Sequence, residues 1–400
     1  MGVQPAEVAD LTTALVAFRH DIHAHPELGF HEHRTSARVA EALTELGLEV
    51  HTGIGGTGVV GVLRNGGSDR KIALRADMDA LPIHEQTGLP YASRNQGAFH
   101  GCGHDGHVAM LLGAARHLVR TRRFDGTINF VFQPAEEGLG GARKMIEAGL
   151  FELCPADQVF ALHNWPDLPV GEIATRPGPI MAAADKFEIQ LTGRGGHAAM
   201  PHQTPDALLA AAQLVAQLNT IVSRCTPPHS SAVLSVTQVH GGHSHNVIPA
   251  EVRLMGTVRT FDPAVQDAIE AALRRMCGGV AASFGLEYEV RYTRYYPATV
   301  NDPEAAAQAL RAAESCGATA RLAPEPAFTS EDFAFMLQAK RGAYLWLGQA
   351  GEGERIPLHH PRYDFNDAVI PTGVAWHVAI VEQQLAASPA AFPFPRPRTA

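Results

Sequence analysis

The chain has 400 residues, of which 46% are hydrophobic and 18% charged, with a formal net charge of −9 and a pI near 6.1. This length predicts two or three domains. The acidic balance argues against a nucleic acid or an anionic membrane surface as partner, because either would require a basic face. No apolar run reaches the roughly 18 residues that a membrane-spanning helix needs, and the N-terminus has no apolar core of the signal-peptide type.

The cysteines indicate the redox compartment of the protein, and the C-terminal composition indicates a flexible end. There are five cysteines, an odd number at wide spacing, with no C-x-x-C pair. This usage is typical of free thiols in a reducing compartment, so we expect a cytoplasmic protein. Residues 389–400 are rich in proline, and we expect a flexible tail there.

The N-terminal region predicts two helices. Apolar residues at helical spacing predict the first from about Leu11 to Ile22, ending just before Pro26. The second is expected over about 35–46, before Gly47. Three histidines lie in or near the first helix, and we expect surface or capping roles for them rather than metal binding. These histidines are His20, His23 and His25.

Three short apolar runs, over 72–76, 128–132 and 159–162, end close to side chains that bind metals well. Helical stretches over 108–120 and 141–148 lie between them. Strands that alternate with helices predict a mostly parallel sheet with helices on both faces. Ligands bind beyond the carboxyl ends of such strands, so we expect the polar side chains to converge at one edge. They are Asp77 and Asp79, then Glu136 and Glu137, then His163.

The pattern changes after Pro179. From Ala183 to Tyr296 the alternation and periodicity predict the order β-α-β-β-α-β, which is that of a ferredoxin-like unit. We therefore expect an α/β protein in which residues 1–182 and 297–400 form a discontinuous domain with the mostly parallel mixed sheet. Residues 183–296 would be an inserted ferredoxin-like α+β domain.

The stretch from Phe99 to His107 contains a thiol, three imidazoles and a carboxylate, with glycines between them. Thiolates and imidazoles are good donors for transition metals, and glycines allow the backbone to fold tightly. Together with later residues they make a set of five donors, which is more than one tetrahedral zinc uses. Such a set suits two divalent ions roughly 3.5–4 Å apart. The five donors are Cys102, His104, Glu137, His163 and His359.

This donor set predicts metal-assisted hydrolysis of an amide or ester. A metal pair lowers the pKa of a bound water to about 7 and polarises a carbonyl. Glu136 is the candidate base that takes the water proton and passes it to the leaving nitrogen, and Asp79 could orient a histidine ligand. An alternative is that Cys102 is a nucleophile with His104 or His107 as its base. We expect His107 to be a packing residue rather than a ligand.

Eight stretches spread along nearly the whole chain carry a resemblance to a known family. In the one-letter code they are HAHPELG at 23–29, RADMDALP at 75–82, HGCGHDGH at 100–107, FQPAEEG at 132–138, LHN at 162–164, GGHAAMPH at 195–202, NVIP at 246–249 and LHHP at 358–361. With these motifs the chain resembles the M20 metallopeptidase family. Within that family it is similar to the amidohydrolase branch of hippurate hydrolases, N-acyl-amino-acid amidohydrolases and plant auxin-conjugate hydrolases.

The resemblance implies a role for each matching residue. It implies that the five donors named above bind two divalent metal ions, for which zinc suits best and manganese, cobalt or nickel could serve, and that Glu136 is the base. It implies that the inserted domain is a lid that forms a homodimer or homotetramer. His197 would then reach the partner's site and stabilise the oxyanion, and Asn246 and Arg259 would be candidates for the substrate carboxylate. His360 stands where the family usually has a small residue, so His359 and His360 compete as ligand; we favour His359.

The resemblance also implies the reaction, which is metal-dependent hydrolysis of the amide bond of small N-acyl amino acids, either hippurate-like or N-acetylated. Two alternatives within the enzymes are an N-acetyl-diaminopimelate-type deacetylase and a dipeptidase. An alternative of a different class is a non-catalytic protein that keeps the metal cage. The carboxylate of Glu136 beside Glu137 argues against that class, because a binding protein does not need the base.

Overall fold

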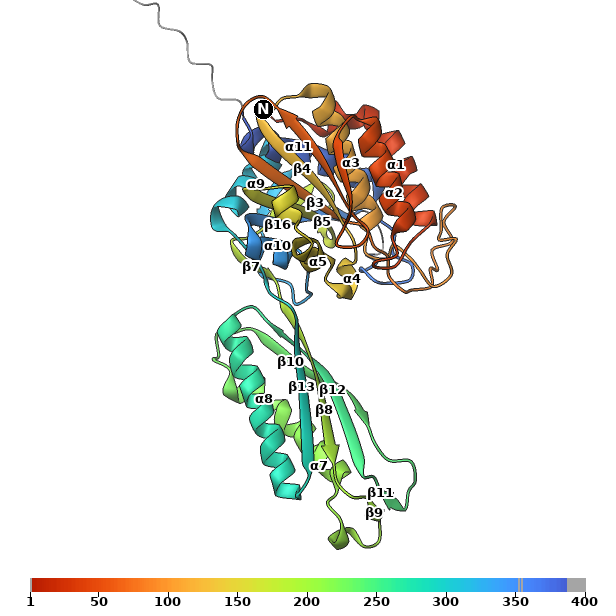
Figure 1. The fold of residues 1–400 in the computed structure, drawn as a ribbon, viewed down its shortest axis with the longest axis vertical. Coiled ribbons are helices and arrows are strands. Elements are labelled where there is room, and N and C mark those ends of the chain that lie inside the picture. The colour runs from red at the N-terminus through yellow and green to blue at the C-terminus, as the bar shows by residue number, and fades with distance from the viewer. Residues whose placement is uncertain (1, 352, 354, 387–400) are drawn as a thin grey trace, which may run out of the picture. The chain divides into compact units, whose positions relative to one another are not determined.

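The computed structural model describes residues 2–351, 353 and 355–386, so the tail predicted at 389–400 lies outside the described residues. The chain divides into two compact units, and Figure 1 labels most of their helices and strands. Unit 1 consists of the chain up to Pro177, Asn301–Ala323 and the chain from Met336 onward. Unit 2 consists of Gly178–Val300 and Pro324–Phe335.

Unit 1 is built on an eight-stranded mixed sheet. Its central strands β4, β3, β5 and β16 are parallel to one another, as βαβ connections require, and the pairs β1–β2, β2–β4 and β16–β6 are antiparallel. The fold class predicted from the sequence is therefore confirmed. In spatial order the strands are β1 (Glu49–Ile54), β2 (Gly58–Asn65), β4 (Gly126–Gln133), β3 (Lys71–Asp77), β5 (Gln158–Pro169), β16 (Arg341–Ala350), β6 (Glu172–Thr175) and β15 (Thr319–Leu322).

The helices of unit 1 pack through one large apolar core. The largest fully buried side chain, Trp376, donates its indole N–H to the carbonyl of Ala309 at 3.1 Å and so joins two helices of this layer. None of the helices in the described residues is both long and apolar enough to cross a membrane. The main helices are α1 (Ala9–Ala24), α2 (His33–Glu45), α3 (His104–Thr121), α5 (Gly141–Glu147), α9 (Pro303–Ser315) and α11 (Ile370–Gln384). The short ones are α4 (Glu136–Leu139) and α6 (Leu150–Leu153), and α10 (Ala334–Ala339) begins with the last two residues assigned to unit 2.

Unit 2 has the predicted order β-α-β-β-α-β and its own apolar core. Its main sheet consists of four antiparallel strands in the order β10-β12-β8-β13. Both helices begin where the sequence provides a cap, because the carboxylates of Asp206 and Asp262 accept backbone N–H groups of the first turn. The elements are β8 (Ala183–Thr192), α7 (Ala207–Leu218), β10 (Ala232–His240), β12 (Glu251–Thr260), α8 (Pro263–Phe284) and β13 (Glu287–Tyr296).

The division into units differs from the predicted boundaries in three places. Residues 178–182 and 297–300, at the two borders of the inserted domain, group with unit 2. Pro324–Phe335, expected in the discontinuous domain, groups with unit 2. The reason is a set of backbone bonds, because the N–H of Ala182 lies 3.1 Å from the carbonyl oxygen of Ala327 and 2.9 Å from that of Thr329. Such pairing between remote segments leaves no trace in local sequence patterns.

Candidate metal centre

Two strand ends and the middle of a third strand bring the predicted donors together. β3 lies between β4 and β5, and both pairs are parallel. Asp77 is the last residue of β3, while Glu136 and Glu137 follow β4 after a short turn. The sequence predicts a strand that ends at His163, but β5 continues past this residue because β16 goes on pairing with it.

The thiol and the first imidazole come from the glycine-rich loop before α3. The sequence predicts that this helix begins near residue 108, but it begins at His104. The side chain of His104 therefore lies in the first turn of the helix. Gly103 has φ +88°, and a Cβ there would stand 2.6 Å from Asn164 Oδ1. Only glycine adopts this conformation without strain, and it allows Cys102 and His104 to be presented two residues apart.

Short distances connect all five predicted ligands. Cys102 Sγ lies 3.6 Å from His163 Nε2. Glu137 Oε1 lies 3.9 Å from His104 Nε2 and 3.3 Å from His359 Nε2. The donor atoms of Cys102, His104 and Glu137 all lie within 4.8 Å of one another, which is close enough to share a cation.

The ring orientations suit metal binding. His104 Nδ1–H donates to the carbonyl of Asp79 at 2.8 Å, and His163 Nδ1–H donates to that of Asn164 at 2.7 Å. Each ring therefore presents its Nε2 to the cage, which is the usual arrangement of metal-binding histidines. Among the described residues, His104 Nε2 and Glu137 Oε1 are buried without a hydrogen-bond partner. Buried polar atoms are rarely left so, and a divalent cation would satisfy both.

The charges around His104 also favour a cation. Burial by itself would lower the pKa of this imidazole, but the carboxylates of Asp77, Asp79 and Glu137 raise it to about 10. Carboxylates are thus in excess over cationic side chains at this point. By contrast, burial and the neighbouring His107 hold the pKa of His163 well below its usual value, so this ring stays neutral and able to ligate.

The thiol of Cys102 is not prepared to act as a nucleophile by its protein neighbours. Burial, and then the charges of Glu137 and Glu136, raise the pKa of Cys102 well above its usual range. A reactive cysteine needs the opposite environment, in which a cation or a helix terminus favours the thiolate. A metal ion supplies such a cation and deprotonates its thiol ligand. The surroundings of Cys102 therefore favour the metal ligand over the catalytic thiol.

Asp79 holds the turn that carries the base and one ligand. Its carboxylate accepts the N–H of Glu136 at 3.0 Å and the N–H of Glu137 at 2.9 Å. The sequence predicts that Asp79 orients a histidine. The carboxylate does lie 3.4 Å from His104 Nδ1, but the main-chain carbonyl of the same residue is nearer. The sequence did not predict that the Asp79 carboxylate accepts hydrogen bonds from two successive backbone N–H groups.

A second buried carboxylate supports the same turn from the other side. Ala135 has a positive φ in the left-handed region, which is uncommon for a residue other than glycine. Its N–H donates to Glu32 Oε1 at 2.8 Å, and the hydroxyl of Thr57 donates to Glu32 Oε2 at 2.5 Å. Nothing in the local sequence around Glu32 marks it as part of the site.

The ionisation of Glu32 should make the stability of the metal-free protein depend on pH. Burial raises the pKa of Glu32 from 4.5 to about 7. The folded protein then holds this proton more tightly than the unfolded chain, so the stabilisation is complete below pH 4.5 and disappears as the pH rises through 7. Between pH 4.5 and 8 we expect the free energy of unfolding of wild type to fall by up to about 3 kcal/mol relative to that of Glu32→Gln, because glutamine cannot ionise. Urea unfolding of both proteins in the presence of a chelator, at several pH values, measures this difference. If the stability of the two proteins changes with pH in the same way, the prediction is refuted.

The loop that carries the last ligand is docked on the glycine-rich loop. The N–H of His359 donates to the carbonyl of Gly101 at 2.8 Å, and the backbone of His359 has a positive φ. The neighbouring His360 instead uses its Nδ1 to accept the N–H of Arg362 at 3.1 Å. Since His359 Nε2 lies beside Glu137, this geometry favours His359 over His360 as the ligand.

His107 is close to the cage, but protein groups occupy both its ring nitrogens. Nδ1–H donates to Asp77 Oδ1 at 2.5 Å, and Nε2 lies 2.5 Å from Asn164 Oδ1. Arg75 donates to the other oxygen of Asp77 at 2.8 Å. Despite its burial, these partners and His104 hold the pKa of Asp77 well below its usual range. This arrangement favours a supporting role for His107 over ligation, but through polar partners and not through the packing role that the sequence predicts.

The three predicted site residues of unit 2 fall into two places. His197 belongs to the short strand β9 (Gly196–His197), which pairs with β11 (Val247–Ile248), and Asn246 directly precedes β11. Arg259 lies near the end of β12 that is opposite to Glu251, where that strand begins. The Arg259 guanidinium donates to the carbonyl of Val258 and the hydroxyl of Thr257.

The mostly parallel centre of a mixed sheet brings together a buried thiol, imidazoles and carboxylates, with buried polar atoms that lack a hydrogen-bond partner. This arrangement is typical of a metal-dependent enzyme. The model of the peptidase family M20/M25/M40 matches residues 73–383. The chain belongs to this family, and it is a metal-dependent amidohydrolase.

Individual relatives match along nearly their whole length. The hippurate hydrolase of Campylobacter jejuni is 40% identical over 385 residues, which cover 95% of this chain and 98% of that protein. The N-acetylcysteine deacetylase of Bacillus subtilis is 40% identical over 361 residues, covering 90% and 93%. A crystal structure of the Bacillus subtilis YXEP protein, described as a dinuclear metal-binding peptidase of the M20 family, has a TM-score of 0.83 and 36% identity, covering 94% and 99%.

Proposed function

We propose that this chain hydrolyses the amide bond of small N-acyl amino acids with two divalent metal ions in the cage of Cys102, His104, Glu137, His163 and His359. The observation that carries the proposal is the convergence of these five donors next to a further carboxylate, Glu136. Relatives named for hippurate and N-acetylcysteine support the substrate class. Zinc suits the thiolate and imidazole donors best, and manganese, cobalt or nickel could replace it.

The chain's own residues then account for the proton transfers. When bound, the divalent ions make a water more acidic and polarise the substrate carbonyl. Glu136, held through its N–H by Asp79, takes the proton of the attacking water. The water oxygen forms a bond to the carbonyl carbon, and the carbon–nitrogen bond then breaks. Glu136 passes its proton to the leaving nitrogen, and the products are a carboxylic acid and a free amino acid.

The positions of His197, Asn246 and Arg259 support a site shared between subunits. Asn246 lies just before β11 and close to the start of β12, whereas Arg259 lies at the far end of β12. Nearly the whole length of this strand separates the two residues, so within one chain they are too far apart to bind the same substrate carboxylate. His197 Nδ1 accepts the N–H of Ala199 at 3.1 Å, which leaves its Nε2–H free to donate to an oxyanion. We propose that unit 2 is a lid through which a homodimer or homotetramer forms, and that His197 serves the partner's site.

His197→Ala should lower turnover by about 10²-fold without changing the metal content, because an oxyanion donor contributes to the transition state and not to metal binding. Steady-state rates and elemental analysis measure the two quantities. His202 is another exposed histidine of the same segment, so His202→Ala is the matched control and should behave like wild type. Loss of metal on His197→Ala would instead make His197 a ligand.

Mixing two inactive variants tests the shared site directly. In a hybrid of Glu136→Gln and His197→Ala subunits, one site combines an intact base with an intact His197 of the other subunit. Random exchange between dimers should therefore restore about a quarter of wild-type activity. A strictly monomeric, fully active protein, or no recovery after proven exchange, would rule out the shared site.

The reaction is tested by measuring release of free amino acid from benzoyl-glycine and from N-acetyl amino acids, using metal-loaded protein with and without chelator. Chelator-sensitive turnover is expected, and the ratio of the two rates defines the acyl preference. Turnover of N-acetyl-diaminopimelate or a dipeptide alone would favour those alternatives. Metal binding without turnover of any of these compounds would favour the non-catalytic protein.

We further propose that the protein works in the cytoplasm. All five cysteines are free thiols, and four of them are buried. A reducing compartment keeps such thiols, including the ligand Cys102, from oxidation.

A further inference from the structure

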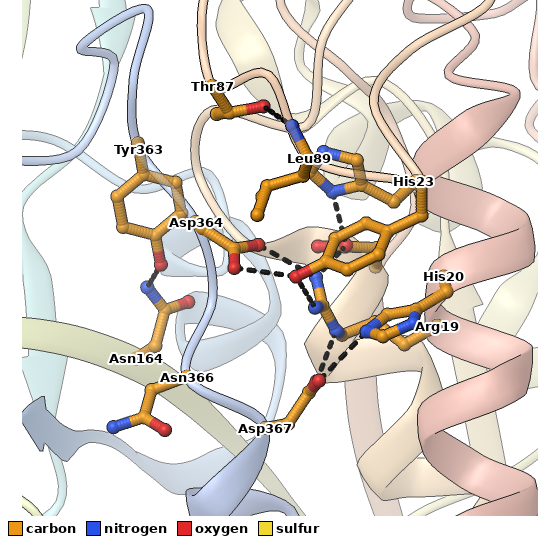
Figure 2. A network of polar contacts seen from close by, with 12 residues as sticks. Arg19, His20, His23, Thr87, Leu89, Asn164, Tyr363, Asp364, Asn366 and Asp367 are labelled. Atoms are coloured by element: carbon orange, nitrogen blue, oxygen red, sulfur yellow. Dashed lines mark hydrogen bonds and ion pairs between the residues drawn. The ribbon is translucent and has the colours of Figure 1, made fainter.

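A buried ionic network in unit 1 lies beside the metal-ligand segments, and Arg19 is at its centre (Figure 2). The side chain of Arg19, on α1, has no exposed surface. Its guanidinium donates to Asp105 Oδ2 at 2.9 Å and to Asp367 Oδ1 at 2.5 Å. It also donates to Asp364 Oδ1 at 3.3 Å and to the hydroxyl of Tyr91 at 3.1 Å.

The carboxylate partners of Arg19 belong to two of the segments that carry ligands. Asp105 directly follows His104 in the first turn of α3. Asp364 and Asp367 follow His359 in the segment that leads to α11. A single guanidinium thus ties both segments to the same side of α1.

The same C-terminal segment also reaches the third ligand strand. The Nδ2–H of Asn164 donates to the hydroxyl of Tyr363 at 2.7 Å, as Figure 2 shows, and Asn164 directly follows His163. The network therefore joins the segments of His104, His163 and His359, although none of its labelled members is itself a proposed ligand.

Asp105 receives a second cationic partner from α1. His23 lies one turn after Arg19, and its Nδ1–H donates to Asp105 Oδ2 at 2.9 Å while its Nε2 faces Glu85 Oε1 at 3.3 Å. The ring is completely buried, so the surface or capping role expected for His23 is wrong. Two residues on successive turns of one helix face thus anchor the carboxylate next to the ligand His104.

We propose that Arg19 is a positioning residue of the metal centre, which fixes the separation of the ligand-bearing segments of His104 and His359. The inference rests on the proposed metal-binding function. Taking a guanidinium out of water is costly, and apolar side chains could pack α1 against α3 without that cost. The planar fork of arginine suits simultaneous bonds to several carboxylates, which lysine, with a single ammonium group, cannot reproduce.

The test measures metal affinity without substrate. Metal-free wild type, Arg19→Lys and Arg19→Met are titrated with Zn²⁺ in competition with a chromophoric chelator. Loss of a partner that orients ligands typically weakens metal binding by about 10–100-fold, and we expect Arg19→Lys to fall in this range. The matched control is Arg120→Met, because Arg120 on α3 pairs with Asp10 on α1 at 2.6 Å but at the exposed surface. It should bind Zn²⁺ like wild type.

A purely structural role would give a different result. If Arg19→Lys unfolds at lower urea but binds Zn²⁺ as tightly as wild type, Arg19 does not position the centre. Should Arg19→Met fail to fold, Asp367→Asn removes one of the two negative charges through which Arg19 holds the His359 segment, on a side chain that is partly exposed. Asp364 still accepts from Arg19, and Zn²⁺ binding should weaken several-fold. If wild type itself binds no Zn²⁺, the proposed function fails, whereas tight binding by every variant refutes only the role of Arg19.

Discussion

Glu136→Gln is expected to lower the turnover of N-acyl amino acids by about 10²–10⁴-fold, because the amide cannot accept the proton of the attacking water. The metal content should stay at the wild-type level, since the five proposed ligands remain in place. The substitution keeps the size of the side chain, and the N–H that donates to Asp79 is unaffected. Rates measured on metal-loaded protein, together with elemental analysis, check both statements.

The adjacent carboxylate provides the matched control. Glu137→Gln alters a proposed ligand whose Oε1 faces His104 and His359, so we expect loss of metal together with loss of activity. The contrast between the two neighbouring glutamates separates base from ligand. Wild-type turnover in Glu136→Gln would show that another group is the base.

Asp79→Asn should weaken both metal binding and turnover. Each oxygen of the Asp79 carboxylate accepts one main-chain N–H of the catalytic turn, whereas asparagine offers a single acceptor and turns an NH₂ group toward the other N–H. Unlike Glu136→Gln, this change should displace both the base and the ligand Glu137. We expect Zn²⁺ affinity to fall by about 10–100-fold and turnover at saturating metal to fall as well.

Asp157→Asn is the control, because it also alters a carboxylate that accepts a backbone N–H, but at a place away from the metal centre. Asp157 accepts the N–H of Lys71 at 2.7 Å, at the start of the strand that ends with Asp77. It should leave Zn²⁺ affinity unchanged. Equal effects of Asp79→Asn and Asp157→Asn would mean that Asp79 supports the fold and not the centre.

The central strands could be predicted because burial leaves a strong local signal. β3, β4 and β5 contain nearly continuous apolar runs, since parallel strands are covered on both faces, and polar donors follow two of them. The strands β1 and β15 lie at the edges of the sheet, with largely exposed and partly polar side chains. Such strands show no clear alternation, and the sequence did not predict them.

The proposed ligands were predicted from a concentration of thiol, imidazole and carboxylate groups, whereas their supports are ordinary residues. Glu32 contacts Ala135 across a long stretch of sequence, and Arg19 meets Asp367 across almost the whole of unit 1. A charge on a helix with few other signals looks like a surface residue until its distant partner is known. Long-range hydrogen bonds and ion pairs of this kind could therefore not be predicted from the sequence.

The most direct measurement is a Zn²⁺ titration of the metal-free protein, with bound metal and hydrolysis of benzoyl-glycine or the best N-acetyl amino acid followed together. We expect two ions per chain, activity that rises as they bind, and complete loss of activity when chelator removes them. Full hydrolysis by protein shown to contain no metal would contradict the proposed function.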